Sequence, residues 1–126
     1  KEAHPRALMT SYNLVNGVHT CENPGLVQTL LREEWGYEGA VMTDWLGGSE
    51  TVHDPNQKYP QFRSRETIEA GVGVLMPGGQ QHYDFLLEGL RDGKMDREKA
   101  LDSAARMVDF AWQMRGKYTT GDVTHA

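Results

Sequence analysis

Three short apolar runs recur along the chain at intervals of about thirty residues, the usual period of a strand–helix unit. They occupy residues 7–12, 39–45 and 72–76, and each is bounded by glycine, proline or polar residues. Such runs are typical of strands that are buried on both faces in a parallel sheet. The sequence therefore predicts an α/β fold with about three parallel βα units.

The helix expected between the first two runs carries the clearest end signals. Asn23 can serve as its N-cap, Pro24 occupies the first helical position, and Gly36 follows its end. Its apolar positions form one stripe, made of Leu26, Val27, Leu30, Leu31 and Trp35. The opposite face, with Arg32, Glu33 and Glu34, is expected to face water.

Further helices are expected at residues 64–70, 81–91 and 96–117. Asp96 is the predicted N-cap of the last one, which carries an apolar stripe of Leu101, Ala104, Val108 and Ala111. Three parallel strands leave two open edges, and a closed (β/α)₈ barrel typically takes about 250 residues. We therefore expect residues 1–117 to form a partial (β/α)₈ TIM-like barrel with a C-terminal helix, and residues 118–126 to be a tail or interdomain linker.

Composition excludes several classes of function. The chain of 126 residues carries a net charge of -5 and has no run rich in lysine or arginine, which argues against nucleic-acid and anionic-membrane partners. No apolar run approaches the length of a membrane span. The single cysteine, Cys21, fits a small buried apolar residue, and the five histidines lack ligand spacing, so we expect neither a metal nor another cofactor.

Asp44 is the candidate for chemistry. In parallel βα architectures the active groups gather at the carboxyl ends of strands, and Asp44 stands there, after a strand that is almost wholly apolar. A solvent-exposed helix cap or loop carboxylate would give the same pattern. Tyr12 ends the first strand and could offer a hydroxyl and a flat face to a sugar, although Tyr12 and Met9 also fit a core role.

An ordered series of motifs resembles glycoside hydrolase family 3, and within it the β-glucosidases. The series is SYN at residues 11–13, VNG at 15–17, CENP at 21–24, LLREEWGYEG at 30–39, VMTDW at 41–45 and AGVGVLMPG at 70–78. The resemblance runs from about residue 7 to residue 117. It implies a TIM-like barrel followed by an α/β sandwich domain, with the active site between them.

The resemblance also implies roles for single residues. Asp44 would be the nucleophile of a retaining mechanism, Trp45 would border the subsite for the terminal sugar, and Met9 and Tyr12 would touch that sugar. A retaining enzyme needs a second carboxyl group about 5–5.5 Å away as acid/base. In the family that group comes from a later loop or domain, so we expect it outside this chain; Glu50 and Asp54 are weaker candidates.

Three positions depart from the family's usual text. Thr43 replaces the usual serine and keeps its hydroxyl, whereas Gly73 and Leu75 replace residues that are commonly acidic. The loop over residues 47–65 is also longer and more polar than usual.

The function predicted from the sequence is hydrolysis of terminal non-reducing β-D-glucosyl residues from β-linked glucosides or short oligosaccharides. The family resemblance favours a periplasmic or extracellular location. A non-catalytic module that binds carbohydrate or a partner is the alternative. A flavodoxin-like phosphate-binding domain fits less well, because no strand is followed by a GxGxxG or GxxxxGK loop. The uncovered sheet is expected to pair with the rest of an enzyme or with copies of itself.

Overall fold

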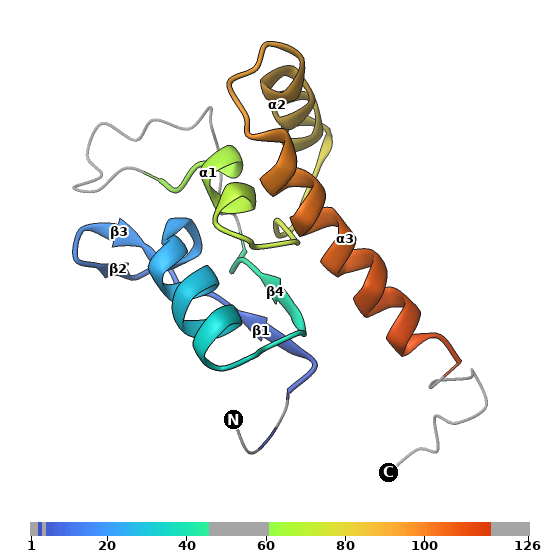
Figure 1. Ribbon diagram of the computed structural model, residues 1–126. Helices are drawn as coiled ribbons and strands as arrows, with labels where there is room; N and C mark the ends of the chain where they lie inside the picture. Colours follow the sequence, from blue (N-terminus) through green and yellow to red (C-terminus); the bar gives the residue numbers. More distant parts are fainter. Residues whose placement is uncertain (1–2, 4, 46–60, 117–126) are drawn as a thin grey trace.

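The computed structural model describes residues 3, 5–45 and 61–116 of the chain. Its centre is strand β4 (Ala40–Met42), which pairs in parallel with β1 (Ala7–Met9) in the register Ala7 to Ala40 and Met9 to Met42. On its other side, Met42 forms a parallel bridge with Val74. The predicted α/β fold with parallel strands is therefore confirmed (Figure 1).

The strands are shorter than predicted, and the third is reduced to a single bridging residue. Thr43 N donates to Val74 O at 2.9 Å, and Gly73 N donates to Val41 O at 2.9 Å. The regular ladder ends there, because the next donor, Met76 N, is bonded to the Thr43 side chain. The prediction that β1 is buried on both faces was also wrong, because Ala7 and Met9 are exposed. In the described chain β1 lies at the edge of the sheet and pairs with β4 alone.

A hairpin that we did not predict follows β1. Strands β2 (Leu14–Val15) and β3 (Val18–His19) are antiparallel and are joined by Asn16 and Gly17, which have φ values of 52° and 82°. Two consecutive positive φ angles are the requirement of a type I′ turn, for which Asn-Gly is the preferred pair. The 3₁₀ helix η1 (Thr20–Glu22) then leads to the first long helix.

The first long helix, η2 (Gly25–Glu34), is a π-helix with Pro24 as N-cap, so it begins one residue later than expected. Asn23 still accepts from Leu26 N through its side chain, at 3.3 Å. Gly36 has a φ of 64° and lets the chain turn away after the helix, as predicted. Val27 is buried on the predicted apolar stripe, whereas Trp35 at its far end is half exposed.

The prediction that Arg32 faces water was wrong, although Glu33 and Glu34 do so. Only 8% of Arg32 is exposed, and its Nη1 donates to the carbonyl oxygens of Tyr37 and Gly39, both at 2.7 Å. Its guanidinium also lies over the Tyr37 ring, 5.2 Å from the centroid. In a π-helix the hydrogen bonds run from residue i to i+5, so side chains are placed differently from those on an α-helical wheel.

Three α-helices complete the described chain, close to the predicted positions. They are α1 (Ser64–Glu69), α2 (Gln80–Arg91) and α3 (Arg97–Met114). Asp96 caps α3 as predicted, because its side chain accepts from the backbone N–H groups of Glu98 and Lys99 at 2.9 and 3.2 Å. None of the helices in these described ranges is long and apolar enough to cross a membrane.

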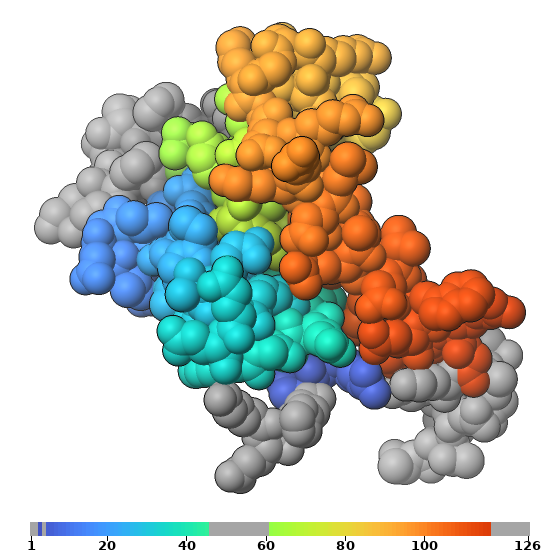
Figure 2. Space-filling model, in the orientation of Figure 1, coloured from blue at the N-terminus to red at the C-terminus, as the bar shows by residue number. Residues whose placement is uncertain are grey.

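Helix α3 packs on the sheet through a face that differs from its apolar stripe. Ser103 is buried and donates from Oγ to Val72 O at 2.9 Å, and Met107 fills the space beside Gly73. Leu101 and Val108 of the stripe are instead exposed. In the space-filling view α3, in orange, lies along the outside of the molecule (Figure 2).

The hydrophobic core lies between η2, β4 and the segment before the Val74 bridge. Its buried members are Cys21, Val27, Val41, Phe62 and Val72, with Leu31 and Tyr37 packed against them. Cys21 is fully buried, as predicted, and its burial raises the pKa of the thiol to about 11. A thiol in this position stays protonated near neutral pH and behaves as an apolar side chain.

Gly39 provides a test of the β1–β4 contact. A Cβ at this position would clash with the Tyr37 ring and hydroxyl and would lie 2.5 Å from Arg6 O, which is also the acceptor for Ala40 N. We expect Gly39→Ala to lower the free energy of unfolding by about 1–3 kcal/mol, as overpacking typically does. Denaturant titration would measure this loss, and amide hydrogen exchange should be faster at Ala40.

Gly36→Ala is the matched control, because a Cβ there meets nothing within 4 Å and the cost comes from its φ of 64° alone. It should leave exchange at Ala40 unchanged. Equal exchange at Ala40 in both variants would contradict a role of Gly39 in the strand contact.

Candidate active site

Asp44 lies two residues beyond Met42, the last residue of β4, at the carboxyl end of the parallel strands. Thr43 before it is fully buried, Asp44 is half-buried, and Trp45 after it is 56% exposed. The chain therefore passes from the core to the surface within three residues. Asp44 Oδ1 accepts from Trp45 N at 2.7 Å, so one carboxylate oxygen is oriented by its own backbone.

Tyr12 reaches the same place from the end of β1. Its hydroxyl donates to Trp45 O at 2.5 Å, which joins the chain after β1 to the chain after β4. Met9 pairs with Met42 in register and therefore lies at the same end of the strands. Met9 and Tyr12 are both more than half exposed, so the predicted site residues stand at an open surface rather than in the core.

The electrostatic neighbourhood of Tyr12 supports its closeness to Asp44. Desolvation raises the pKa of the Tyr12 hydroxyl above its ordinary value, and the Asp44 carboxylate raises it further through hydrogen bonding and its negative charge. A carboxylate disfavours a phenolate beside it, because two negative charges would repel each other. Near neutral pH Tyr12 is thus a neutral hydrogen-bond donor next to an acceptor group.

No second carboxyl group is assigned to the site. The two weaker candidates for the acid/base, Glu50 and Asp54, lie outside the described residues. A metal centre is not formed either: within residues 5–45 and 61–116 no three His, Cys, Asp or Glu side chains gather closely enough to hold a metal ion.

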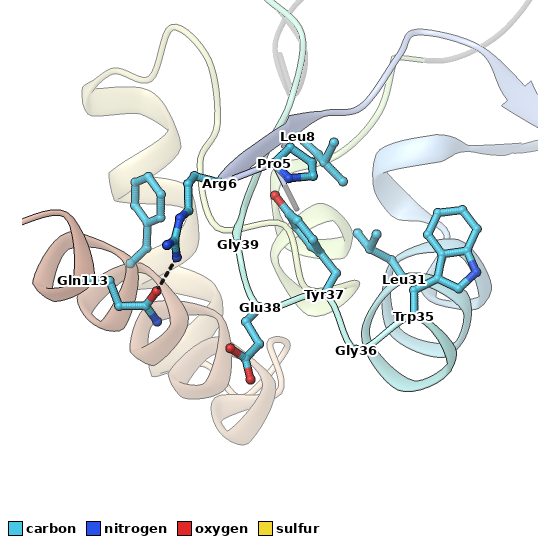
Figure 3. Close-up of a pocket in the computed structure, with 11 residues that line it drawn as sticks. Pro5, Arg6, Leu8, Leu31, Trp35, Gly36, Tyr37, Glu38, Gly39 and Gln113 are labelled. Carbon is cyan, nitrogen blue, oxygen red and sulfur yellow. Dashed lines mark hydrogen bonds between the residues drawn. The ribbon is translucent and has the colours of Figure 1, made fainter. Parts of the chain in front are cut away.

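A hollow of about 440 Å³ lies at the opposite end of the strands (Figure 3). Arg6 and Gly39, which precede β1 and β4, line it together with Tyr37 and Trp35, and Arg6 donates to Gln113 across its mouth at 3.1 Å. Because Asp44 follows β4 while Gly39 precedes it, this hollow is separate from the candidate site.

The structure adds one side-chain group that sequence reasoning did not assign to the site, the Thr43 hydroxyl. Thr43 Oγ1 accepts from Met76 N at 2.9 Å, and on the other side of the strand the backbone N–H of Thr10 donates to Met42 O at 2.8 Å. One bond through a side chain and one through the backbone thus hold the end of β4 directly before Asp44. A hydroxyl residue at the end of an apolar strand was the available signal, but its partner is 33 residues away and could not be read from the sequence.

The chain belongs to glycosyl hydrolase family 3, because the model of the family's N-terminal domain matches residues 2–110. The motif resemblance is confirmed by this match. A β-glucosidase of Rhizobium radiobacter is 39% identical over 86% of the chain, and a probable β-glucosidase J of Aspergillus fumigatus is 40% identical over 84%. The chain spans only 12% and 11% of the lengths of these two relatives.

Solved structures give the same result. The GH3 β-glucosidase of Bifidobacterium adolescentis superposes with a TM-score of 0.73 at 33% identity, over 97% of this chain and 16% of its own. β-Glucosidase 3B of Thermotoga neapolitana, solved in complex with glucose, gives a TM-score of 0.67 at 32% identity, over 84% and 14%. The described fold is therefore shared with family 3 β-glucosidases.

The contact between Tyr12 and Asp44 can be tested without measuring activity. Asp44→Asn removes the negative charge, so we expect the pKa of Tyr12 to fall towards its ordinary value. NMR titration of tyrosine labelled with ¹³C at Cζ would measure the shift, with Tyr12→Phe identifying the signal. Tyr37 serves as the internal control, because its pKa is raised by burial and Asp44 is not among the causes. An unchanged pKa of Tyr12 in Asp44→Asn would show that the Tyr12 hydroxyl and the Asp44 carboxylate are not in contact.

Proposed function

We propose that this chain contributes the nucleophile of a retaining β-glycosidase, most specifically a β-glucosidase, and that Asp44 is that nucleophile. The observation that carries the proposal is the position of Asp44 at the carboxyl end of β4, held by Trp45 N and beside the Tyr12 hydroxyl. Family 3 membership and relatives named β-glucosidase support glucosides as the substrates.

The reaction would proceed in two displacements. In the first, an Asp44 carboxylate oxygen forms a bond to the anomeric carbon, while the bond to the leaving oxygen breaks and its electron pair departs with the aglycone. The acid/base group protonates that oxygen. In the second displacement, the same acid/base group takes a proton from water, and the water oxygen displaces Asp44 from the anomeric carbon. We infer that this acid/base is supplied from outside these 126 residues.

Trp45, Tyr12 and Met9 would hold the sugar. Trp45 is 56% exposed directly after the nucleophile and can offer the flat face of its indole to the apolar face of a pyranose ring. The Tyr12 hydroxyl is engaged with Trp45 O, so its first contribution is to fix the backbone on which Trp45 stands. Met9 adds an exposed apolar side chain at the same strand end.

We further infer that the three parallel strands are part of a TIM-like barrel. The order β1, β4 and Val74 follows the chain, with helices between the strands, as in a (β/α)₈ barrel. The exposed face of β1 and the hollow beside it are surfaces that further βα units, or a second copy of the chain, would cover.

The nucleophile assignment has a direct test in the full-length gene product that carries this chain. Asp44→Asn should lower turnover of 4-nitrophenyl β-D-glucoside by roughly 10³-fold or more, since the covalent step is lost. A 2-deoxy-2-fluoroglucoside should label Asp44 in the unmodified enzyme, as peptide mass spectrometry would detect. Glu33→Gln, which removes a charge on the exposed side of η2, should leave turnover unchanged. Labelling of another carboxylate while Asp44 stays unmodified would refute the assignment.

The supporting side chains should matter less than the nucleophile. Tyr12→Phe and Trp45→Ala each remove contacts without removing the bond-forming group. A hydrogen bond contributes about 0.5–1.5 kcal/mol, so kcat/KM should fall roughly 2- to 13-fold for Tyr12→Phe. Steady-state kinetics would measure both variants. A loss as large as that of Asp44→Asn in a folded variant would show that the side chain takes part in the chemistry itself.

A further inference from the structure

Directly after β4, the hydrogen bonds to the segment around Val74 depart from the regular pattern of a parallel ladder. Met42 bridges Val74, Val74 N donates to Val41 O, and Thr43 N donates to Val74 O. In a regular ladder the next bond would run from Met76 N to the carbonyl oxygen of Thr43. Instead, Met76 N donates to the Thr43 hydroxyl at 2.9 Å.

The Thr43 hydroxyl thus takes the place of a backbone carbonyl oxygen as acceptor, at the residue directly before Asp44. Thr43 is fully buried, so its side chain is enclosed by protein and cannot exchange this bond for water. The Thr43 side chain satisfies the Met76 donor, so the Thr43 carbonyl oxygen is not used for this bond. Asp44 follows directly, and its carboxylate accepts from Trp45 N.

From this geometry we propose that Thr43 is a positioning residue that sets the direction of the Asp44 carboxylate. This inference rests on the proposed function of Asp44. Thr43 would not touch the sugar: its hydroxyl fixes the strand end through Met76 N, and its backbone N–H fixes the same end through Val74 O. Correct alignment of a reacting group is a large part of enzymatic rate enhancement, and a misplacement of about 1 Å can cost roughly 10²-fold.

Two variants separate the hydroxyl from the methyl group of Thr43. Thr43→Val has nearly the same shape but cannot accept from Met76 N. The Met76 donor then either stays unpaired or bonds to the carbonyl oxygen of residue 43, which would shift the backbone before Asp44. Thr43→Ser keeps the acceptor and loses the methyl group. Thr10→Val is the matched control one strand away, because the Thr10 hydroxyl makes a long 3.4 Å contact to Met42 O, which Thr10 N already bonds at 2.8 Å.

The experiment uses the full-length gene product and a 2-deoxy-2-fluoroglucoside with a dinitrophenyl leaving group. The released dinitrophenol gives both the rate of labelling and the number of sites labelled. We expect Thr43→Val to label Asp44 to full stoichiometry at a rate lowered roughly 10- to 100-fold, with inhibition by free glucose little changed. Thr43→Ser and Thr10→Val should label within about threefold of the unmodified enzyme. If Thr43→Val does not fold, Thr43→Ala, which removes the same hydroxyl, is labelled in its place and compared with Thr43→Ser and Thr10→Val.

Each other outcome overturns the inference. An unchanged rate in Thr43→Val would show that the hydroxyl does not position the nucleophile. A normal rate at reduced stoichiometry would reveal a loss of folded protein, and thus a structural role only. An equally slow Thr43→Ser would assign the effect to the methyl group. If the unmodified enzyme is labelled elsewhere than at Asp44, the proposed function falls first and the positioning role with it.

Discussion

The described structure depends on β4 being bonded on both sides. β1 pairs with it from one edge, and the Val72–Val74 segment bonds to it from the other through Val41 and Thr43. Ala40, Val41 and Thr43 are almost inaccessible to water, whereas Ala7 and Met9 of β1 are exposed. A three-residue strand has few hydrogen bonds of its own, so its position is fixed by these neighbours and by the core residues packed against it. The candidate nucleophile, Asp44, directly follows Thr43, whose backbone N–H is bonded to Val74 O.

A buried arginine holds the other end of this strand. The Nη1 of Arg32 binds the carbonyl oxygens of Tyr37 and Gly39, so it connects the last turn of η2 to the residue before β4. Burial lowers the pKa of Arg32, and the nearby charge of Arg106 acts in the same direction. An arginine remains charged under these conditions, and the two carbonyl acceptors of Nη1 offset part of the cost of burying that charge. The start of β4 is thus held by a charged clamp and its end by hydroxyl and backbone bonds.

The two ends of β4 have different roles. At the amino end lie the Arg32 clamp and the close approach of Gly39 to Arg6 O, both of which serve stability. At the carboxyl end Thr43, Asp44 and Trp45 lead from the core to an open surface. This separation is usual in parallel βα architectures, in which loops at the carboxyl ends of strands can vary without disturbing the packing beneath them. Gly73 serves the packing beneath this surface, because Met107 of α3 occupies the space that a side chain at residue 73 would need.

The sequence by itself determined the local features. The strand positions, the Asp96 cap, the turn after Gly36 and the candidate residue Asp44 follow from apolar runs and short motifs, whose physical causes lie within a few residues of each other. The Asn-Gly hairpin was also readable in this way, although we did not predict it. The tertiary structure decided whatever required a distant partner. It set the inward face of η2 and α3, the burial of Arg32, the reduction of the third strand to one bridge and the bond from Met76 to Thr43. These features depend on which surfaces meet after the chain has folded, and no periodicity in a single segment encodes them.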